Sequence, residues 1–202
     1  MQGRKKIKNL AVHLALICIS FIIAFPFLWM FTNSIKTKDE IWAVPPKVLP
    51  AIAQWGNYAD ALADGTFLRY MWNSAYTAII ITVVVLFNSA MFAYALTHIR
   101  FRWKKLLITL IMVTYIMPAT TTYVPSYVIL SKMGLMNSHA GYVVSSCASI
   151  FNIFFLRTTF TQINPGIVEA ARIDGAGHWK ILWWVVAPIS ASSFVTLGLL
   201  SF

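Results

Sequence analysis

Long apolar runs alternate with short polar tracts along this chain. Several of the runs meet the length of about 20 mostly apolar residues that a helix needs to cross a membrane. The tracts between them are short, except for one loop after the first run. We therefore predict helical spans at residues 10–34, 74–96, 106–129, 141–156 and 183–202.

The composition supports an all-α polytopic membrane protein with a single transmembrane domain over residues 1–202. Hydrophobic residues make up 59% of the chain and charged residues 11%, whereas soluble domains average about 25% charged residues. The first span follows a basic tail, as a signal peptide does. Its apolar stretch is longer than a signal core and lacks a cleavage pattern, which favours a retained span.

The last predicted span is incomplete. Only the residues from Ile189 to Phe202 follow Pro188, which is too few to complete a span after the proline. No polar or charged flank closes this segment. We therefore expect a chain that is truncated inside its fifth span.

The Lys and Arg residues are distributed unequally between the two sides, and an excess of these residues marks the cytoplasmic side. The tail and the loops after spans two and four hold eleven of them, against five in the other two loops. The eleven are Arg4, Lys5, Lys6, Lys8, Arg100, Arg102, Lys104, Lys105, Arg157, Arg172 and Lys180; the five are Lys36, Lys38, Lys47, Arg69 and Lys132. We predict a cytoplasmic N-terminus. The net charge of +10 therefore reflects orientation toward the anionic inner leaflet and not nucleic-acid binding.

Residues suited to catalysis or metal binding are sparse. Cys18 and Cys147 form no paired motif, and the four histidines are scattered over different segments. A metal site is not expected, although distant residues can converge. No GxxxxGK[ST] phosphate loop is present, and no charged residue lies in the middle of a span, as a proton relay would require. The pattern favours a non-catalytic subunit that moves a neutral polar solute with external power.

Several polar residues fall inside the predicted spans, where lipid cannot satisfy their hydrogen bonds. They are candidates for a substrate path, and hydrogen bonding between helices by small polar residues is the competing interpretation. The third span also carries prolines that interrupt a helix, so we hypothesise a kink beside the substrate route. The candidate path residues are Asn88, Thr114, Tyr115, Pro118, Thr121 and Asn152.

The loop at residues 36–72 is the longest segment outside the spans. Val44-Pro45-Pro46 and Pro50 disfavour regular structure there. A short helix is predicted up to Asp64, with Gly65 as its stop. The loop fits a receptor-docking surface and a connector along the membrane interface about equally well.

The polar tract at residues 157–182 predicts a short helix, a turn and a second helix on the cytoplasmic side. Asn164 is a good helix cap, Pro165 suits a first turn, and Gly175 can adopt the left-handed conformation that ends a helix. The second helix is expected to run along the interface and to turn at Pro188 into the last span. A connector without a partner has the same shape.

The residues of this tract resemble the EAA signature of permeases of binding-protein-dependent ABC importers. The matching positions are Glu169-Ala170-Ala171, Gly175 and Pro188. Matches along the rest of the chain are similar to the carbohydrate-uptake branch, the maltose-type second permease; they include Pro26 to Met30, Asn57-Tyr58, Ala93 to Leu96 and Ile173 to Ala176. Val185 and Ala187 stand where the family favours Ile and Leu, and these are conservative changes.

The resemblance implies a type I importer fold with six spans, of which about five are present here, in a bacterial inner or plasma membrane. It implies assembly with a second permease, two ATPase subunits and an extracytoplasmic solute-binding protein. ATP and Mg would act in the ATPase subunits, so no cofactor is expected on this chain. Glu169 is implied as a polar anchor, Ala170 and Ala171 as a close-packing face, Asp174 as a helix-end contact and Gly175 as the turn.

Other functions remain open from the sequence. An importer for an amino acid, a polyamine or phosphate shares the loop signature, and a channel or carrier without an ATPase shares the polar spans. A membrane enzyme would need paired acids, a metal cluster or an activated nucleophile, and none is visible.

Overall fold

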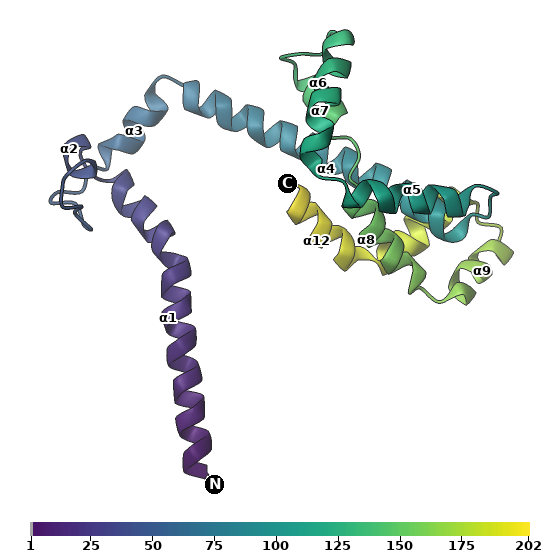
Figure 1. Cartoon of the computed structure of the whole chain (residues 1–202), viewed down its shortest axis with the longest axis horizontal. Coiled ribbons are helices and arrows are strands. Elements are labelled where there is room, and N and C mark those ends of the chain that lie inside the picture. Colours follow the sequence, from purple (N-terminus) through teal and green to yellow (C-terminus); the bar gives the residue numbers. More distant parts are fainter. Residues whose placement is uncertain (1) are drawn as a thin grey trace. The chain divides into compact units, whose positions relative to one another are not determined.

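The computed structural model describes residues 2–202, except for the side chains of residues 2–8, 10, 11 and 119. The basic side chains of Arg4, Lys5, Lys6 and Lys8 therefore lie outside the described part. Within that part all regular structure is helical (Figure 1), which confirms the predicted all-α class. The chain divides into a first unit of residues 1–71 and a second unit of residues 72–202, and each is described by itself.

The first unit contains one long helix and a small loop structure. Helix α1 (Gln2–Ser34) includes an apolar stretch, Val12–Ser34, that is long enough to span a membrane. Helices α2 (Lys38–Ile41) and α3 (Gly56–Ala63) follow. Gly65 adopts a φ of 70° just after α3, as its predicted role as a stop requires.

A capping box at the start of α2 shapes the loop that precedes α3. The Thr37 hydroxyl accepts a hydrogen bond from the backbone of Glu40, and the Glu40 carboxylate accepts one from the backbone of Thr37. The same carboxylate accepts a bond of 2.8 Å from the N–H of Ala51. These donors, Ala51 first and then Thr37, hold the pKa of Glu40 below its ordinary value.

Helix α4 (Thr66–His98) is the second helix that is long and apolar enough to cross a membrane. Ser89 and Ala93 lie on its buried face and are completely covered. Small residues four apart allow a neighbouring helix to approach closely. The spacing of Ser89 and Ala93 therefore suits close packing of α4 against its neighbours.

The third and fourth predicted spans are not single straight helices. Helix α5 (Lys104–Ile116), the 3-10 turn η1 (Ala119–Thr122) and helix α6 (Tyr123–Lys132) replace the third, with a bend of 102°. The break falls at Met117, which is extended ahead of Pro118. Pro125 lies within the first turn of α6, where a proline is tolerated.

Helices α7 (His139–Ser145) and α8 (Ile150–Thr161) meet at 48° in place of the fourth predicted span. Ser149 starts the second of them, because its hydroxyl accepts a hydrogen bond from the N–H of Asn152 at 3.2 Å. Helix α8 continues to Thr161, five residues beyond the predicted end at 156.

The last helices follow the predicted coupling tract. They are α9 (Pro165–Ile173), α10 (His178–Lys180), the π-helical segment η2 (Ile181–Val186), α11 (Ala187–Ile189) and α12 (Ala191–Ser201). The predicted turn at Pro188 is wrong in position. The chain bends by 84° at Ser190, because Pro188 stands in the first turn of α11, where its missing N–H is tolerated.

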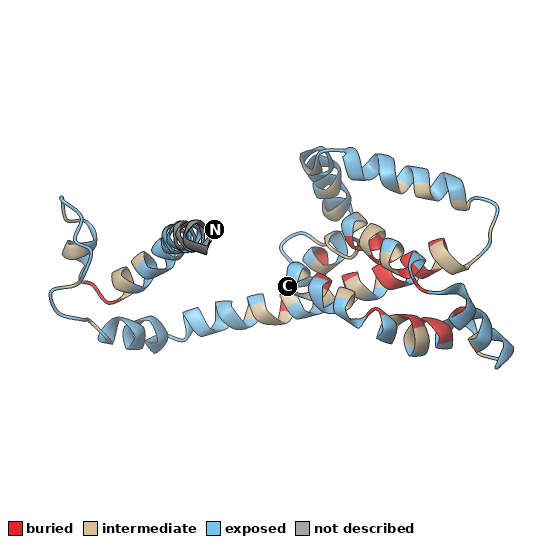
Figure 2. Ribbon diagram, turned by 90° about the horizontal axis from the view of Figure 1, so that it is seen from below, coloured by how far each residue is buried: buried red, intermediate tan, exposed pale blue. Residues whose placement is uncertain are grey.

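The core of the second unit lies where α4, α8, α9, η2 and α12 meet. Figure 2 shows its buried residues in red. They include Ala90, Ala93, Tyr94, Leu156, Phe160, Val168, Ile181, Val186 and Leu197. Two described helices are suited to span a membrane, and the number rises to five if each bent pair counts as one span. The predicted span count therefore stays a prediction.

Candidate functional site

Helix α9 begins as its sequence predicts. The Asn164 side chain accepts a hydrogen bond of 2.9 Å from the N–H of Gly166, and Pro165 occupies the first helical position. The side-chain oxygen satisfies a backbone donor that has no partner inside the helix. Pro165 adds no unsatisfied donor and already has a helical φ.

The end of α9 is a Schellman motif centred on Gly175. Gly175 has a φ of 81°, its N–H donates to the carbonyl of Arg172, and the N–H of Ala176 donates to the carbonyl of Ala171, both at 3.0 Å. Ala171 and Ala176 also pack against the same core. This pattern of two bonds and one apolar contact fixes the direction in which the chain leaves a helix.

Helix α9 has one face toward the core and one face toward solvent. Val168 is buried and Ala171 packs against the core, three positions apart. Glu169, Ala170 and Ile173 are exposed on the other side, and Ile173 is 86% accessible. The spacing of three and four residues explains this division. The two alanines of the signature therefore have different surroundings.

A side chain of α9 also ties it to the end of α4. The Arg172 guanidinium donates to the carbonyl of His98, the last residue of α4, at 3.0 Å. That carbonyl has no partner within its own helix, and a cation is favourable at a helix C-terminus. This bond links α9 directly to the end of α4.

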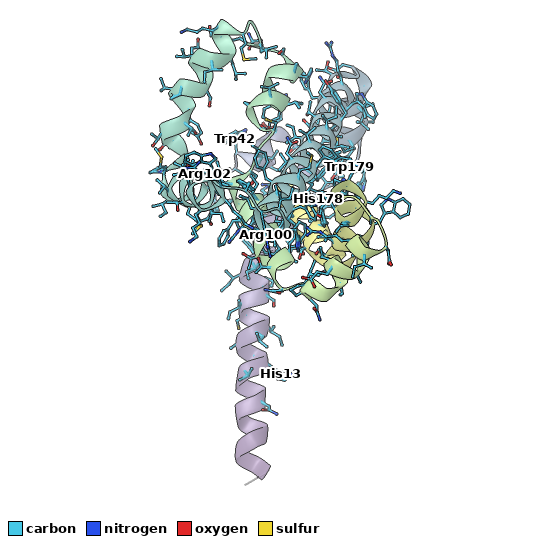
Figure 3. All side chains as sticks on the ribbon, turned by 90° about the vertical axis from the view of Figure 1, so that its right-hand side faces the viewer. His13, Trp42, Arg100, Arg102, His178 and Trp179 are labelled. Carbon is cyan, nitrogen blue, oxygen red and sulfur yellow. The ribbon has the colours of Figure 1, made fainter. Side chains whose placement is uncertain are left out.

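A second link lies just beyond the glycine turn. The Tyr94 hydroxyl and the His178 Nδ1 are 3.1 Å apart, which joins α4 to the start of α10. Figure 3 labels His178 together with its neighbour Trp179. Phe87 packs edge-on against the Trp179 ring and stacks on Trp183 at 5.5 Å. Both helices of the tract therefore rest on α4.

A basic pocket of about 330 Å³ lies between α9 and the connection from α4 to α5. Its charged lining residues are Arg100, Lys104, Glu169 and Arg172, with His98 beside them. The Lys104 ammonium donates to the carbonyls of Thr97 at 3.0 Å and Ile99 at 3.3 Å. Two of the cations therefore cap the end of α4.

The remaining residues of the predicted coupling set lie at helix ends. Asp174 is the exposed C-cap of α9, and its N–H donates to the carbonyl of Ala170 at 3.0 Å. Pro188 is exposed in α11. Helix α9 packs against η2, the segment that precedes Pro188.

Two of the predicted path residues make hydrogen bonds to distant segments of the chain. The Asn88 amide donates to the carbonyl of Cys147 at 2.9 Å, and the buried Asn152 amide donates to the Ser201 hydroxyl at 3.0 Å. These contacts match the helix-packing interpretation.

The other four path residues lie on or after α5. The Thr114 hydroxyl donates to the carbonyl of Leu110 at 2.8 Å, and Tyr115 stacks on Phe154 at 6.3 Å. Pro118 and Thr121 are exposed at the break after α5. A role of these side chains in the substrate path stays a prediction.

Sequence reasoning did not assign the residues that fasten α9. Arg172 and Lys104 were counted only as cations of the cytoplasmic side, and His178 as one of several scattered histidines. Arg172 stands four positions after the buried Val168, and its exposed side chain reaches the carbonyl of His98. That spacing is the one signal in the sequence that places Arg172 next to the core-facing side of α9.

The chain matches a family of known proteins and a solved structure. Residues 89–202 match the model of the family described as "Binding-protein-dependent transport system inner membrane component". A bacterial ABC transporter that imports the acidic polysaccharide alginate has a similar crystal structure. It has a TM-score of 0.79 and 26% identity over 97% of this chain and 69% of that chain.

Three curated relatives carry transport names. The chain is 30% identical to the sn-glycerol-3-phosphate transport system permease protein UgpE of Brucella suis, over 98% of this chain and 72% of the relative. It is 30% identical to the diacetylchitobiose uptake system permease protein NgcG of Streptomyces coelicolor, over 94% and 63%. It is 25% identical to the lactose transport system permease protein LacG of Rhizobium radiobacter, over 98% and 72%.

Proposed function

The chain belongs to the family of inner membrane components of binding-protein-dependent transport systems, and on this premise we propose that it is the permease subunit of an ATP-driven importer of a sugar or oligosaccharide. The subunit is non-catalytic. It carries the solute inward by alternating access, with the power supplied by partner subunits.

The shape and attachment of α9 carry this proposal. Its exposed face offers Glu169, Ala170 and Ile173 to a partner, while Arg172 and Val168 hold the opposite face to the rest of the second unit. A helix that is fastened on one face and exposed on the other is suited to bind a partner and to follow the movement of that partner. Since the chain has no phosphate loop, we propose that a separate ATPase drives the movement of α9.

The partners and the location follow from this assignment. Glu169 to Gly175 sit in a cleft of one of two ATPase subunits, and a second permease completes the pathway. A solute-binding protein delivers the solute from outside a bacterial inner membrane. The N-terminus is cytoplasmic, since this orientation places the basic loops beside α9 on the inner side.

The chemical class of solute follows from the relatives and from the spans. Chitobiose and lactose systems stand beside a glycerol phosphate system among the similar proteins. No charged residue lies in the middle of a predicted span, which favours a neutral solute over an anion. Import of a phosphorylated solute is the competing outcome, and competition between unlabelled lactose and glycerol phosphate in the uptake assay distinguishes the two.

The decisive experiment joins the chain to candidate ATPase and permease subunits encoded beside it. We expect the ATPase to co-purify with the chain and uptake into cells to require ATP. Ile173→Asp places a charge on the exposed tip of α9 and is expected to release the ATPase. Gln162→Asp, an exposed position before α9, is the matched control and is expected to keep it. Uptake without any ATPase would support a channel and overturn the proposal.

A further inference from the structure

The loop between α1 and α3 is closed at its base against the last turn of α1. The N–H of Gln54 donates to the carbonyl of Ile35 at 2.8 Å. The Asn57 amide donates to the carbonyls of Ser34 and Lys36, both at 3.0 Å. Residues 35–55, which we call the α1–α3 lobe, therefore begin and end at the same place on α1.

Lys36 folds the middle of this lobe back along α1. Its side chain is only 2% exposed, although it is a cation. The ammonium donates to the Asn33 side-chain oxygen at 2.7 Å and to the carbonyl of Lys47 at 2.6 Å, and it lies 4.6 Å from the centre of the Trp29 ring. A buried lysine requires partners of this kind. The bond to Lys47 holds that part of the lobe at the level of Trp29.

Val48 and Leu49, which follow Lys47, extend the contact with α1 toward the N-terminus of that helix. Val48 and Leu49 share an apolar pocket of about 240 Å³ with side chains of α1. The α1 members of that lining are Phe21, Phe25, Leu28, Trp29 and Thr32. With a rise of about 1.5 Å per residue, Trp29 and Phe25 lie about 7.5 and 13.5 Å before the end of α1 at Ser34. The tip of the lobe thus lies beside the apolar stretch and not beyond it.

The outer surface of the lobe is apolar. Val44 is 94% exposed, and Trp42, Ile52, Leu49 and Val48 are between 60% and 83% exposed. The apolar stretch of α1 beside them is also uncovered within the described structure. A helix of that composition is stable in hydrocarbon. Val48 and Leu49 line one pocket with Phe25, so hydrocarbon around α1 at that level would also reach these two side chains.

We propose that the α1–α3 lobe inserts its tip, Val44 to Leu49, into the lipid leaflet at the C-terminal end of α1, with acyl chains as its partner. Lys36 is the clamp that holds the tip at this depth. The exposed Lys47 side chain extends toward the lipid headgroups, as long cationic side chains do, and the charged helix α2 stays at the headgroup level. The proposal rests on α1 spanning the membrane, but not on the solute or the ATPase.

The depth of the tip is measured with spin labels on the full chain in vesicles of phosphatidylethanolamine and phosphatidylglycerol. Single cysteines replace Val48 or Leu49 in a background with Cys18→Ser and Cys147→Ser. Asp39→Cys on α2 is the control at the headgroup level. We expect the labels at 48 and 49 to collide with oxygen several-fold more than with a water-soluble nickel chelate, and the label at 39 to show the reverse. Nickel access at 48 and 49, or protection from both reagents, would overturn the proposal.

The clamp is tested in the same vesicles. Lys36→Ala removes both hydrogen bonds that the ammonium donates, so the label at 48 is expected to become accessible to nickel. Lys47→Ala is the matched control, because the Lys36 ammonium bonds only to the backbone carbonyl of Lys47, which the substitution keeps; the label at 48 is expected to stay protected from nickel. An unchanged depth in the Lys36 variant would refute the clamp. These readouts need no transport activity, so they separate this proposal from the proposed function.

Discussion

Replacing Gly175 tests whether the geometry of the turn after α9 couples the subunit to its partner. Gly175→Val places a β-branched residue at a φ of 81°, a conformation that such residues avoid. An added Cβ would meet no atom within 4 Å. The substitution therefore perturbs backbone conformation without a steric clash, and Gly175→Asn is the matched control, since asparagine tolerates the left-handed region.

The size of the effect follows from the two ways in which the chain can respond. Keeping the left-handed conformation costs roughly 1–2 kcal/mol for an ordinary L-residue. Leaving it breaks the two Schellman bonds to Arg172 and Ala171, at about 0.5–1.5 kcal/mol each. Losing both bonds therefore costs about 1–3 kcal/mol, and the cheaper of the two responses sets the penalty at about 1–2 kcal/mol. That penalty corresponds to a factor of roughly 5–30 in the ratio of intact to broken turn.

The assay compares solute uptake and ATP hydrolysis in the reconstituted importer, with membrane yield as the check on insertion. We expect Gly175→Val to lose coupled uptake by about the same factor of 5–30 while it still inserts. Gly175→Asn is expected to keep most of the uptake. Normal uptake with valine would refute the reasoning, and so would an equal loss with asparagine, because the effect would then not depend on the left-handed turn.

Three further substitutions test other parts of the second unit. Arg172→Ala removes the bond to the end of α4 and is expected to lower the amount of solute taken up per ATP hydrolysed. Lys180→Ala changes an exposed residue and is the control, which is expected to keep that ratio. An equal ratio of uptake to hydrolysis in the two variants would contradict the link. Asn152→Leu removes the bond to Ser201 and is expected to lower the free energy of unfolding by about 0.6 kcal/mol, the average for such bonds in membranes. Denaturant titration measures this loss. A loss of transport without a loss of stability would support the substrate-path interpretation instead. Leu156→Ala empties a fully buried position and is expected to cost roughly 2–5 kcal/mol, seen as a lower midpoint of thermal unfolding; an unchanged midpoint would contradict the assigned core.

The features of α9 that depend on neighbours in sequence were predicted correctly. Asn164 caps the helix, Pro165 starts it and Gly175 ends it in the left-handed conformation. Each of these effects acts within one turn of a helix, so the residue type and its position are sufficient to predict it.

The interruptions of the spans were predicted less well. Pro118 correctly predicts the break after α5, because a proline disfavours the helical conformation of the residue before it in every context. Pro188 predicts a bend at its own position, whereas the chain bends at Ser190. The cost of a proline depends on whether its missing N–H had a partner, and the π-helical segment before Pro188 is not visible in the sequence.

The sequence by itself determined the membrane class, the family and the helix, turn and helix of the coupling tract, because hydropathy and capping are properties of short segments. Only the tertiary structure decided what the charged residues do. Arg172 reaches the carbonyl of His98, far away in the sequence, and Lys36, counted at first as one more cation of a loop, is buried against Trp29. The sequence shows the same residue type whether a cation is solvated or bound to partners. Only the three-dimensional arrangement supplies the carbonyl oxygens and the ring that stabilise these cations.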